Sequence, residues 1–153
     1  MRRTELQISL SALENNLKVI KSFTNASVQG VVKANFYGLF DDKMHEIIEQ
    51  NVESYAVITI DEAVSLRKLT SKPILLFQGV HEQNDYEMIE ENNLDFTIHS
   101  SWQLEGLSDF NLENSRIWLK LNTGIKRLCF NDKEFIIALK EIEILNIKDI
   151  VLM

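Results

Sequence analysis

Apolar side chains follow two alternating patterns along the chain: short runs rich in β-branched residues, and longer segments in which apolar positions recur every three or four residues. The first pattern is typical of buried strands and the second of amphipathic helices. The short runs predict strands at about 28–33, 55–60, 74–78, 94–99, 116–121 and 149–153. The segments of helical period predict helices at about 12–22, 41–50, 61–69, 85–91, 100–107 and 131–142.

Polar residues mark where these helices begin. A serine or asparagine followed three residues later by glutamate or glutamine forms a capping box, in which each side chain bonds the backbone amide of the other residue. Three such pairs are predicted to cap helices: Ser11 with Glu14, Ser100 with Gln103, and Asn131 with Glu134. Asp61 is expected to cap the helix after the second strand, and a turn is expected at Tyr37-Gly38.

Each connection between strands contains a helix, so the strands are expected to run parallel. A right-handed crossover of this kind returns the chain to the same end of the sheet. Units of about 20 residues suit a (β/α)₈ barrel at least as well as a doubly wound sheet, and periodicity alone does not separate the two.

The length of the chain fits part of a barrel. A complete barrel takes about 250 residues, and this chain has 153. In the barrel alternative, this α/β chain would form the N-terminal part of a TIM-like barrel, with about five βα units and the start of a sixth strand, as a single partial barrel over residues 1–153. Unpaired amides on its first and last strands predict self-association, domain-swapped closure or a partner that carries the remaining strands.

Composition and charge narrow the functional classes. Hydrophobic residues make up 45% of the chain and charged residues 25%, which is typical of one soluble globular domain. A net charge of −7 argues against a nucleic-acid partner. No apolar run approaches the roughly 20 residues of a membrane span. The single Cys129 and three scattered histidines match no metal pattern, so we expect a reducing, cytoplasmic setting and no metal.

The first candidate for chemistry is Lys33, because an apolar strand ends on this lysine. Barrel enzymes build their active sites at the carboxyl ends of the strands. Burial favours the neutral form of an amine, which is the form that attacks an aldehyde. The alternative is a strand-end lysine that simply reaches into solvent.

The second candidate segment runs from Trp118 to Leu128, where a strand leads into a polar loop that contains glycine. Lys120 interrupts the apolar strand. Arg127 has a planar guanidinium suited to a carboxylate or a phenolate oxygen. The three cations Lys120, Lys126 and Arg127 would together attract small anionic molecules. The alternative is a solvated basic loop.

Other aromatic residues are expected to belong to the core rather than to contact a cofactor. They are Phe77, Phe96, Trp102, Trp118 and Phe130. Among the histidines, His99 ranks first as a candidate because it lies at the end of a predicted strand.

Together the two segments resemble the alanine racemase family. The stretch from Val32 to Gly38, V-K-A-N-F-Y-G, looks like that family's cofactor-lysine motif V-K-A-N-A-Y-G-H-G. The stretch from Leu119 to Leu128, L-K-L-N-T-G-I-K-R-L, is similar to its motif K-x-D-T-G-M-x-R-L-G. The opening I-S-L-S-A-L with Asn16, and the strands near Tyr55 and Pro73, follow the family's order. The resemblance therefore covers essentially the whole chain, and it implies that residues 1–153 form the N-terminal part of that family's TIM-like barrel.

The resemblance implies an isomerase that depends on pyridoxal 5'-phosphate and interconverts L- and D-alanine for D-alanine biosynthesis. It implies a homodimer with a small amino acid as substrate and no membrane partner. Lys33 would carry the cofactor covalently and act as one of two acid-base groups on the substrate Cα. Tyr37 would contact the cofactor phosphate. Arg127 would bind near the cofactor's phenolic oxygen and the substrate carboxylate, and Lys120 would hold Arg127 in place.

Several positions depart from the family's motifs. Leu39-Phe40 stand where the family has histidine and glycine, Asn122 replaces an aspartate, Ile125 a methionine and Cys129 a glycine. A cysteine would be strained if its position required a positive φ.

The resemblance also implies groups that lie outside the matched segments. The family's second base is a tyrosine from a C-terminal β domain, and its late barrel strands supply much of the phosphate site. Neither is expected in residues 1–153, so we expect this chain alone to be inactive as a racemase and to retain the cofactor weakly. Two other functions stay open: a non-catalytic barrel that binds pyridoxal phosphate, and a self-associating relic domain that binds nothing.

Overall fold

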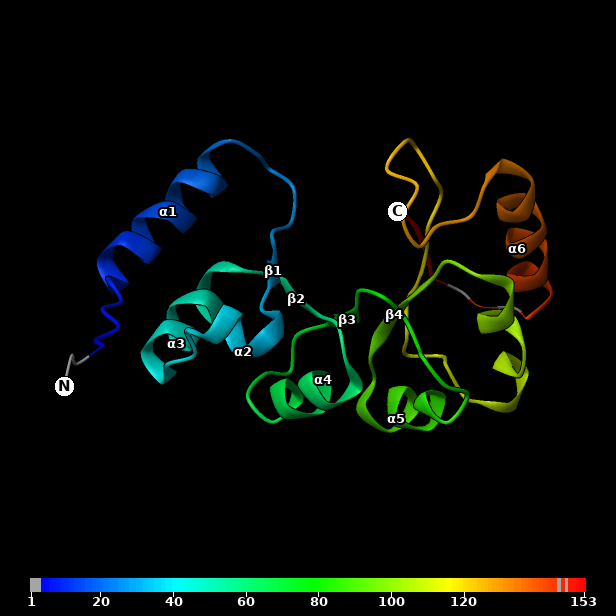
Figure 1. Cartoon of the computed structure of the whole chain (residues 1–153), viewed down its shortest axis with the longest axis horizontal. Coiled ribbons are helices and arrows are strands. Elements are labelled where there is room, and N and C mark those ends of the chain that lie inside the picture. Colours follow the sequence, from blue (N-terminus) through cyan, green and yellow to red (C-terminus); the bar gives the residue numbers. More distant parts are fainter. Residues whose placement is uncertain (1–3, 146, 148) are drawn as a thin grey trace.

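In the computed structural model, the described residues are 4–145, 147 and 149–153. Strands and helices alternate as the sequence pattern predicts (Figure 1). In chain order they are α1 Leu10–Ser22, β1 Gln29–Val31, α2 Lys33–Gly38, α3 Asp42–Asn51, β2 Ser54–Val57, α4 Ile60–Arg67, β3 Ile74–Leu76, α5 Asp85–Asn92, β4 Asp95–Ile98, η1 Ser101–Leu104, η2 Leu107–Asp109, β5 Ile117–Leu119, α6 Asp132–Ile144 and β6 Ile150–Leu152. No helix in the described part of the chain is long and apolar enough to cross a membrane.

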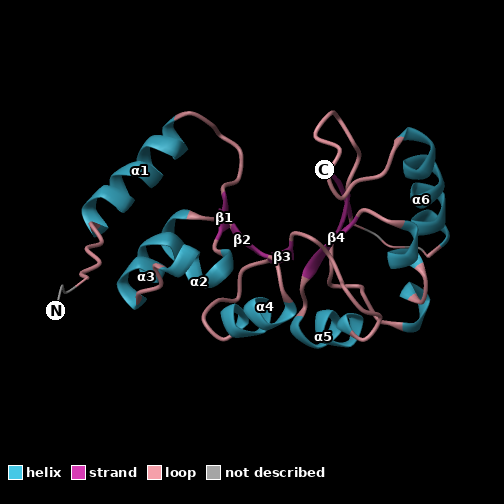
Figure 2. Cartoon of the chain, in the orientation of Figure 1, coloured by secondary structure: helices cyan, strands magenta, loops and turns pink. Residues whose placement is uncertain are grey.

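Within the described residues, the sheet has six parallel strands in the order β1-β2-β3-β4-β5-β6. A doubly wound sheet would reverse its strand order at a switch point and carry helices on both faces. Here the order is sequential, and the helices lie along the outer side of a curved sheet (Figure 2). The structure therefore confirms the N-terminal part of a barrel. The barrel is not closed, because β1 and β6 form the two edges of the sheet.

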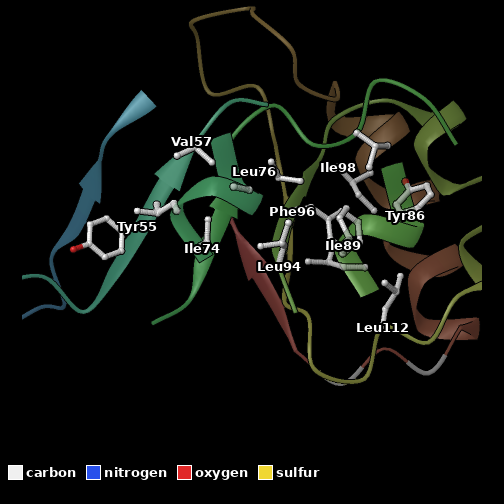
Figure 3. Packing of buried hydrophobic residues seen from close by; sticks show 14 of the residues in the cluster. Tyr55, Val57, Ile74, Leu76, Tyr86, Ile89, Leu94, Phe96, Ile98 and Leu112 are labelled. Carbon is white, nitrogen blue, oxygen red and sulfur yellow. The ribbon is translucent and has the colours of Figure 1, made fainter. Parts of the chain in front are cut away.

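The core lies between the sheet and the helices that cover it. Strand residues that point outward are fully buried against these helices, for example Tyr55, Ile74 and Phe96 (Figure 3). The edge strands differ from the central ones: Val31 of β1 is 42% exposed and Leu152 of β6 is 67% exposed. Exposed apolar side chains on unpaired edges favour further strand pairing.

Two helix starts show how well the capping signals predict. Asn131 caps α6 in a complete capping box with Glu134, as predicted. Helix α1 begins earlier than predicted, and the prediction that Ser11 caps it is wrong. Ser9 has the extended backbone that an N-cap needs, and its hydroxyl accepts a hydrogen bond from the Ala12 amide at 3.3 Å, whereas Ser11 lies inside the helix.

Two other predicted caps are also corrected. Thr59 rather than Asp61 caps α4, because Thr59 has the extended backbone and completes a capping box with Glu62. Ser100 makes no capping hydrogen bond through its side chain. The single helix predicted after β4 is two short 3₁₀ turns, η1 and η2, separated at Gly106, which has a left-handed backbone with a φ of 75°.

Candidate active site

The carboxyl ends of the strands bring two lysines, a histidine and a phenylalanine to one edge of the sheet. Successive strand residues point to opposite faces, so residues two apart share a face. The register of β1 to β5 aligns their inner-facing positions. Each of the four residues lies two residues after an inner-facing strand position. The four are Lys33, Phe77, His99 and Lys120. Two predicted site residues therefore share this edge, the one on which barrels build active sites.

Lys33 lies where β1 gives way to an unusual turn. The backbone of Val32 still pairs with β2, its amide donating to the Ala56 carbonyl at 3.0 Å. From residue 34 to residue 37 the chain is left-handed, with φ between 51° and 58°. The predicted strand 28–33 thus ends early, and Lys33 opens this turn. Left-handed backbone costs about 1–2 kcal/mol for each residue that is not glycine, and such strain concentrates at functional sites.

The left-handed turn brings Tyr37 back towards Lys33. The Lys33 Nζ lies 5.9 Å from the centroid of the Tyr37 ring. Phe36 helps to hold the turn in place. Its amide donates a hydrogen bond to the Val32 carbonyl at 3.0 Å, and its ring is buried. Lys33 is half-buried and Tyr37 is 59% exposed. The amine and the phenol therefore stand together at a surface that a ligand can reach.

Lys120 and Arg127 share a second region of the same edge. Both line a cleft of about 310 Å³ together with Phe77, Cys129 and Met153. The Lys120 Nζ lies 5.4 Å from the centroid of the Phe77 ring. The prediction that Phe77 belongs to the core is therefore wrong. Its ring faces Lys120 instead of the covering helices. The alternation of side chains along β3 could have predicted this orientation, since Phe77 is two residues beyond the inner-facing Leu75.

The loop that carries Arg127 is folded by local hydrogen bonds. The side-chain oxygen of Asn122 accepts from the amides of Gly124 and Lys126, each at 3.0 Å. An amide oxygen accepts as a carboxylate does, so the replacement of the family's aspartate by Asn122 keeps this turn. Positive φ values in this loop fall on Gly124, Lys126 and Leu128 and not on Cys129, so the cysteine is not strained by its backbone.

The predicted site residues fall into two groups. The cleft lined by Lys120 and Arg127 does not include Lys33 or Tyr37. The carboxyl ends of β2, β3 and β4 lie between the two groups. The structure therefore places the predicted site residues at one edge of the sheet but does not join them in one cleft. These residues are Lys33, Tyr37, Lys120 and Arg127.

His99 is fixed between these groups by hydrogen bonds. Its Nε2 lies 3.0 Å from the Gln78 carbonyl oxygen, and its backbone amide donates to the side chain of Gln103 at 2.9 Å. Gln103 is fully buried and also donates to the Val80 carbonyl at 3.1 Å. A carbonyl can only accept, so Nε2 carries the proton and Nδ1 keeps its lone pair.

The environment of His99 predicts a dependence of stability on pH. Burial lowers the pKa of His99 below its ordinary 6.5, the Lys120 ammonium acts in the same direction, and the bond to Gln78 opposes them. The unfolded chain therefore binds more protons than the folded chain just below pH 6.5. We expect the free energy of unfolding to fall as pH drops from 6.5 to the folded pKa, and His99→Gln to remove this part of the dependence.

Denaturant unfolding at a series of pH values measures the effect. A His99→Gln profile that runs parallel to the wild-type profile would contradict this account of His99.

Comparison with known proteins adds an independent observation. Residues 8–153 match the family model described as the N-terminal domain of alanine racemase. The alanine racemase of Haemophilus influenzae is 38% identical over 125 residues, which are 80% of this chain and 35% of that protein. The alanine racemase of Wigglesworthia glossinidia brevipalpis is 36% identical over 138 residues, which are 88% of this chain and 38% of that protein. The chain thus spans less than half the length of these relatives.

Solved structures show the same fold. The alanine racemase of Acinetobacter baumannii superposes with a TM-score of 0.83 at 26% identity, over 95% of this chain and 45% of that structure. The biosynthetic alanine racemase of Pseudomonas aeruginosa gives a TM-score of 0.83 at 27% identity, over 94% of this chain and 41% of that structure.

Proposed function

Since this chain belongs to the alanine racemase family through its N-terminal domain, we propose that it binds pyridoxal 5'-phosphate on Lys33 for the interconversion of L- and D-alanine. The observation that carries the proposal is the placement of Lys33. Its amine is half-buried at the carboxyl end of β1, beside Tyr37, and the turn that aligns the two is held in a strained left-handed conformation. Strain of this kind persists where the surrounding structure enforces it for function.

The chemistry of these side chains fits pyridoxal phosphate. Its aldehyde requires a primary amine, which Lys33 offers, and its phosphate requires hydrogen-bond donors, of which the exposed Tyr37 hydroxyl is one. When bound, the cofactor supplies an electron sink for negative charge on the substrate Cα. Lys33 would hold or move a proton at that carbon.

The cleft at the end of β5 would serve the anionic side of the substrate. Arg127 offers a planar set of donors for a carboxylate or a phenolic oxygen. Lys120 lines the same cleft, with its Nζ over the ring of Phe77. We propose that Lys120 keeps Arg127 oriented. Bringing this cleft and Lys33 around one substrate would complete the site.

The activity of a whole racemase needs more than these residues. Racemisation requires acid-base groups on both faces of the substrate Cα, and Lys33 would serve one of them. We propose that the opposite group comes from a C-terminal β domain in a homodimer, in a cytoplasmic setting. A polypeptide of these 153 residues alone is expected to bind the cofactor without racemising alanine.

The test is to trap the cofactor on the chain. The protein is incubated with pyridoxal phosphate and reduced with borohydride, and the modified lysine is mapped by mass spectrometry. We expect the label on Lys33. Labelling that is spread evenly over exposed lysines would contradict the proposal, and uptake without D-alanine formation would identify the chain as a cofactor-binding unit.

A further inference from the structure

One carboxylate connects the backbone around Lys33 to the start of α4. The Oε1 of Glu62 accepts a hydrogen bond from the Ala34 amide at 2.7 Å. Its Oε2 accepts from the amides of Ile58 and Thr59, at 2.9 Å and 3.2 Å. Glu62 therefore ties together two segments, the one that follows β1 and the one that follows β2.

The bond to Ala34 lies at the point where the left-handed turn begins. Ala34 directly follows Lys33 and is the first residue of the turn with positive φ. An L-residue in this conformation relaxes unless something holds it. A hydrogen bond to an ionised acceptor is about twice as strong as a neutral one, and this one acts on the peptide group next to the lysine. Loss of this bond would free the backbone on which Lys33 is mounted.

The electrostatics of Glu62 agree with an ionised clamp. Burial alone would raise the pKa of Glu62, but the hydrogen bonds from backbone amides outweigh it. The attraction of the Lys33 ammonium acts in the same direction as these bonds. The pKa of Glu62 therefore lies below its usual 4.5, and the carboxylate stays charged at neutral pH.

We propose that Glu62 is a positioning residue, which aims the amine of Lys33 by clamping the Ala34 amide. The proposal rests on the proposed function of Lys33 as the cofactor lysine. The capping box of α4 needs only one bond at the Glu62 carboxylate, the one donated by the Thr59 amide, so the bond donated by the Ala34 amide is an additional contact that capping does not require.

Two other residues provide matched controls, because each breaks a capping box without touching the clamp. Glu134 occupies the same position in α6 and accepts only from its own N-cap, Asn131, at 3.1 Å. Thr59 is the other half of the capping box of α4 and does not bond Ala34. Glu134→Ala and Thr59→Ala therefore measure the effect of a lost cap alone.

The experiment compares Glu62→Gln with these two controls in the 153-residue chain. Glutamine has one acceptor oxygen, so it cannot accept at both of the positions that the two carboxylate oxygens of Glu62 serve. We expect exchange of the Ala34 amide proton to speed up about tenfold in Glu62→Gln, the effect of losing one charge-assisted hydrogen bond. The rate of pyridoxal phosphate trapping on Lys33 should fall by about the same factor. Both controls should lose helix stability but keep both rates.

Equal effects in Glu62→Gln and Thr59→Ala would overturn the proposal, since capping would then explain the result. A different outcome separates the two proposals. If the wild-type chain traps no pyridoxal phosphate on Lys33, the proposed function fails. The clamp is then judged by Ala34 exchange and by the rate at which acetic anhydride modifies Lys33, and unchanged rates in Glu62→Gln would overturn it.

The pH dependence of the clamp gives a second readout. A carboxyl whose folded pKa is lowered stabilises the fold above its unfolded pKa, and this contribution is lost as pH falls through the folded value. Protection of the Ala34 amide should therefore persist down to pH 4.5 and disappear only below it. Loss of protection that begins above this pH would show that the ionised form of Glu62 is not what holds Ala34.

Discussion

The variant Lys33→Ala is expected to take up no borohydride-reducible pyridoxal phosphate at the candidate site, whereas the wild-type chain is labelled there. The reason is chemical: a covalent bond to the cofactor aldehyde requires a primary amine. Lys120 does not offer a substitute, because it lies over Phe77 in a cleft that does not include position 33. Visible absorbance of the bound cofactor and peptide mapping after reduction both measure the loss.

The matched control for this variant is Lys68→Ala, which removes an exposed lysine at the end of α4. It should keep the label on residue 33. If Lys33→Ala and Lys68→Ala are labelled to the same extent as the wild type, Lys33 does not carry the cofactor. Far-ultraviolet circular dichroism shows whether each variant is folded, so a loss of labelling is not confused with unfolding.

The variant Gly79→Ala is expected to lose about 3–5 kcal/mol of the free energy of unfolding, the largest change in stability that we predict. Gly79 has a φ of +71°, and a Cβ there would lie 2.0 Å from the Thr97 carbonyl oxygen and 2.7 Å from the Gln103 side-chain nitrogen. The turn after β3 packs directly on β4, so the backbone would have to move. Denaturant unfolding measures the loss.

Gly38 offers the control for the backbone part of this effect. Its φ is +77°, and a Cβ there would meet nothing within 4 Å. Gly38→Ala should therefore cost only the intrinsic penalty of left-handed backbone, about 1–2 kcal/mol. Similar losses in the two variants would contradict the close contact at Gly79. Failure of Gly79→Ala to fold, beside a folded Gly38→Ala, would agree with it.

Local patterns were enough to predict most of the elements. The alternation of helical period and β-branched runs predicted the parallel βα units, and the pair Asn131 and Glu134 predicted the start of α6. Two wrong cap predictions came where two local signals competed. Ser9 and Ser11, like Thr59 and Asp61, are both capable of capping, and the backbone conformation that selects one of them depends on how the helix packs.

The candidate site divides in the same way. The sequence by itself determined the side chains on which the proposed chemistry rests: a lysine at a strand end, a tyrosine four residues later, and an arginine and a lysine in the later strand-loop segment. Side-chain type and local spacing are properties of the chain, and the resemblance to a family uses the same information. The tertiary structure decided which groups support that chemistry. Glu62 is one turn into a later helix, and only the parallel pairing of β1 with β2 brings its carboxylate to the Ala34 amide.

The same distinction applies to Phe77, His99 and the left-handed turn. Phe77 was expected in the core, but the pleat of β3 turns it towards Lys120. The lowered pKa of His99 arises from burial in the folded chain, which sequence spacing does not reveal. The strained turn after Lys33 exists because contacts from Glu62 and Phe36 hold it against its local preference. Contacts between residues distant in sequence depend on the register of the sheet, so the structure alone could reveal them.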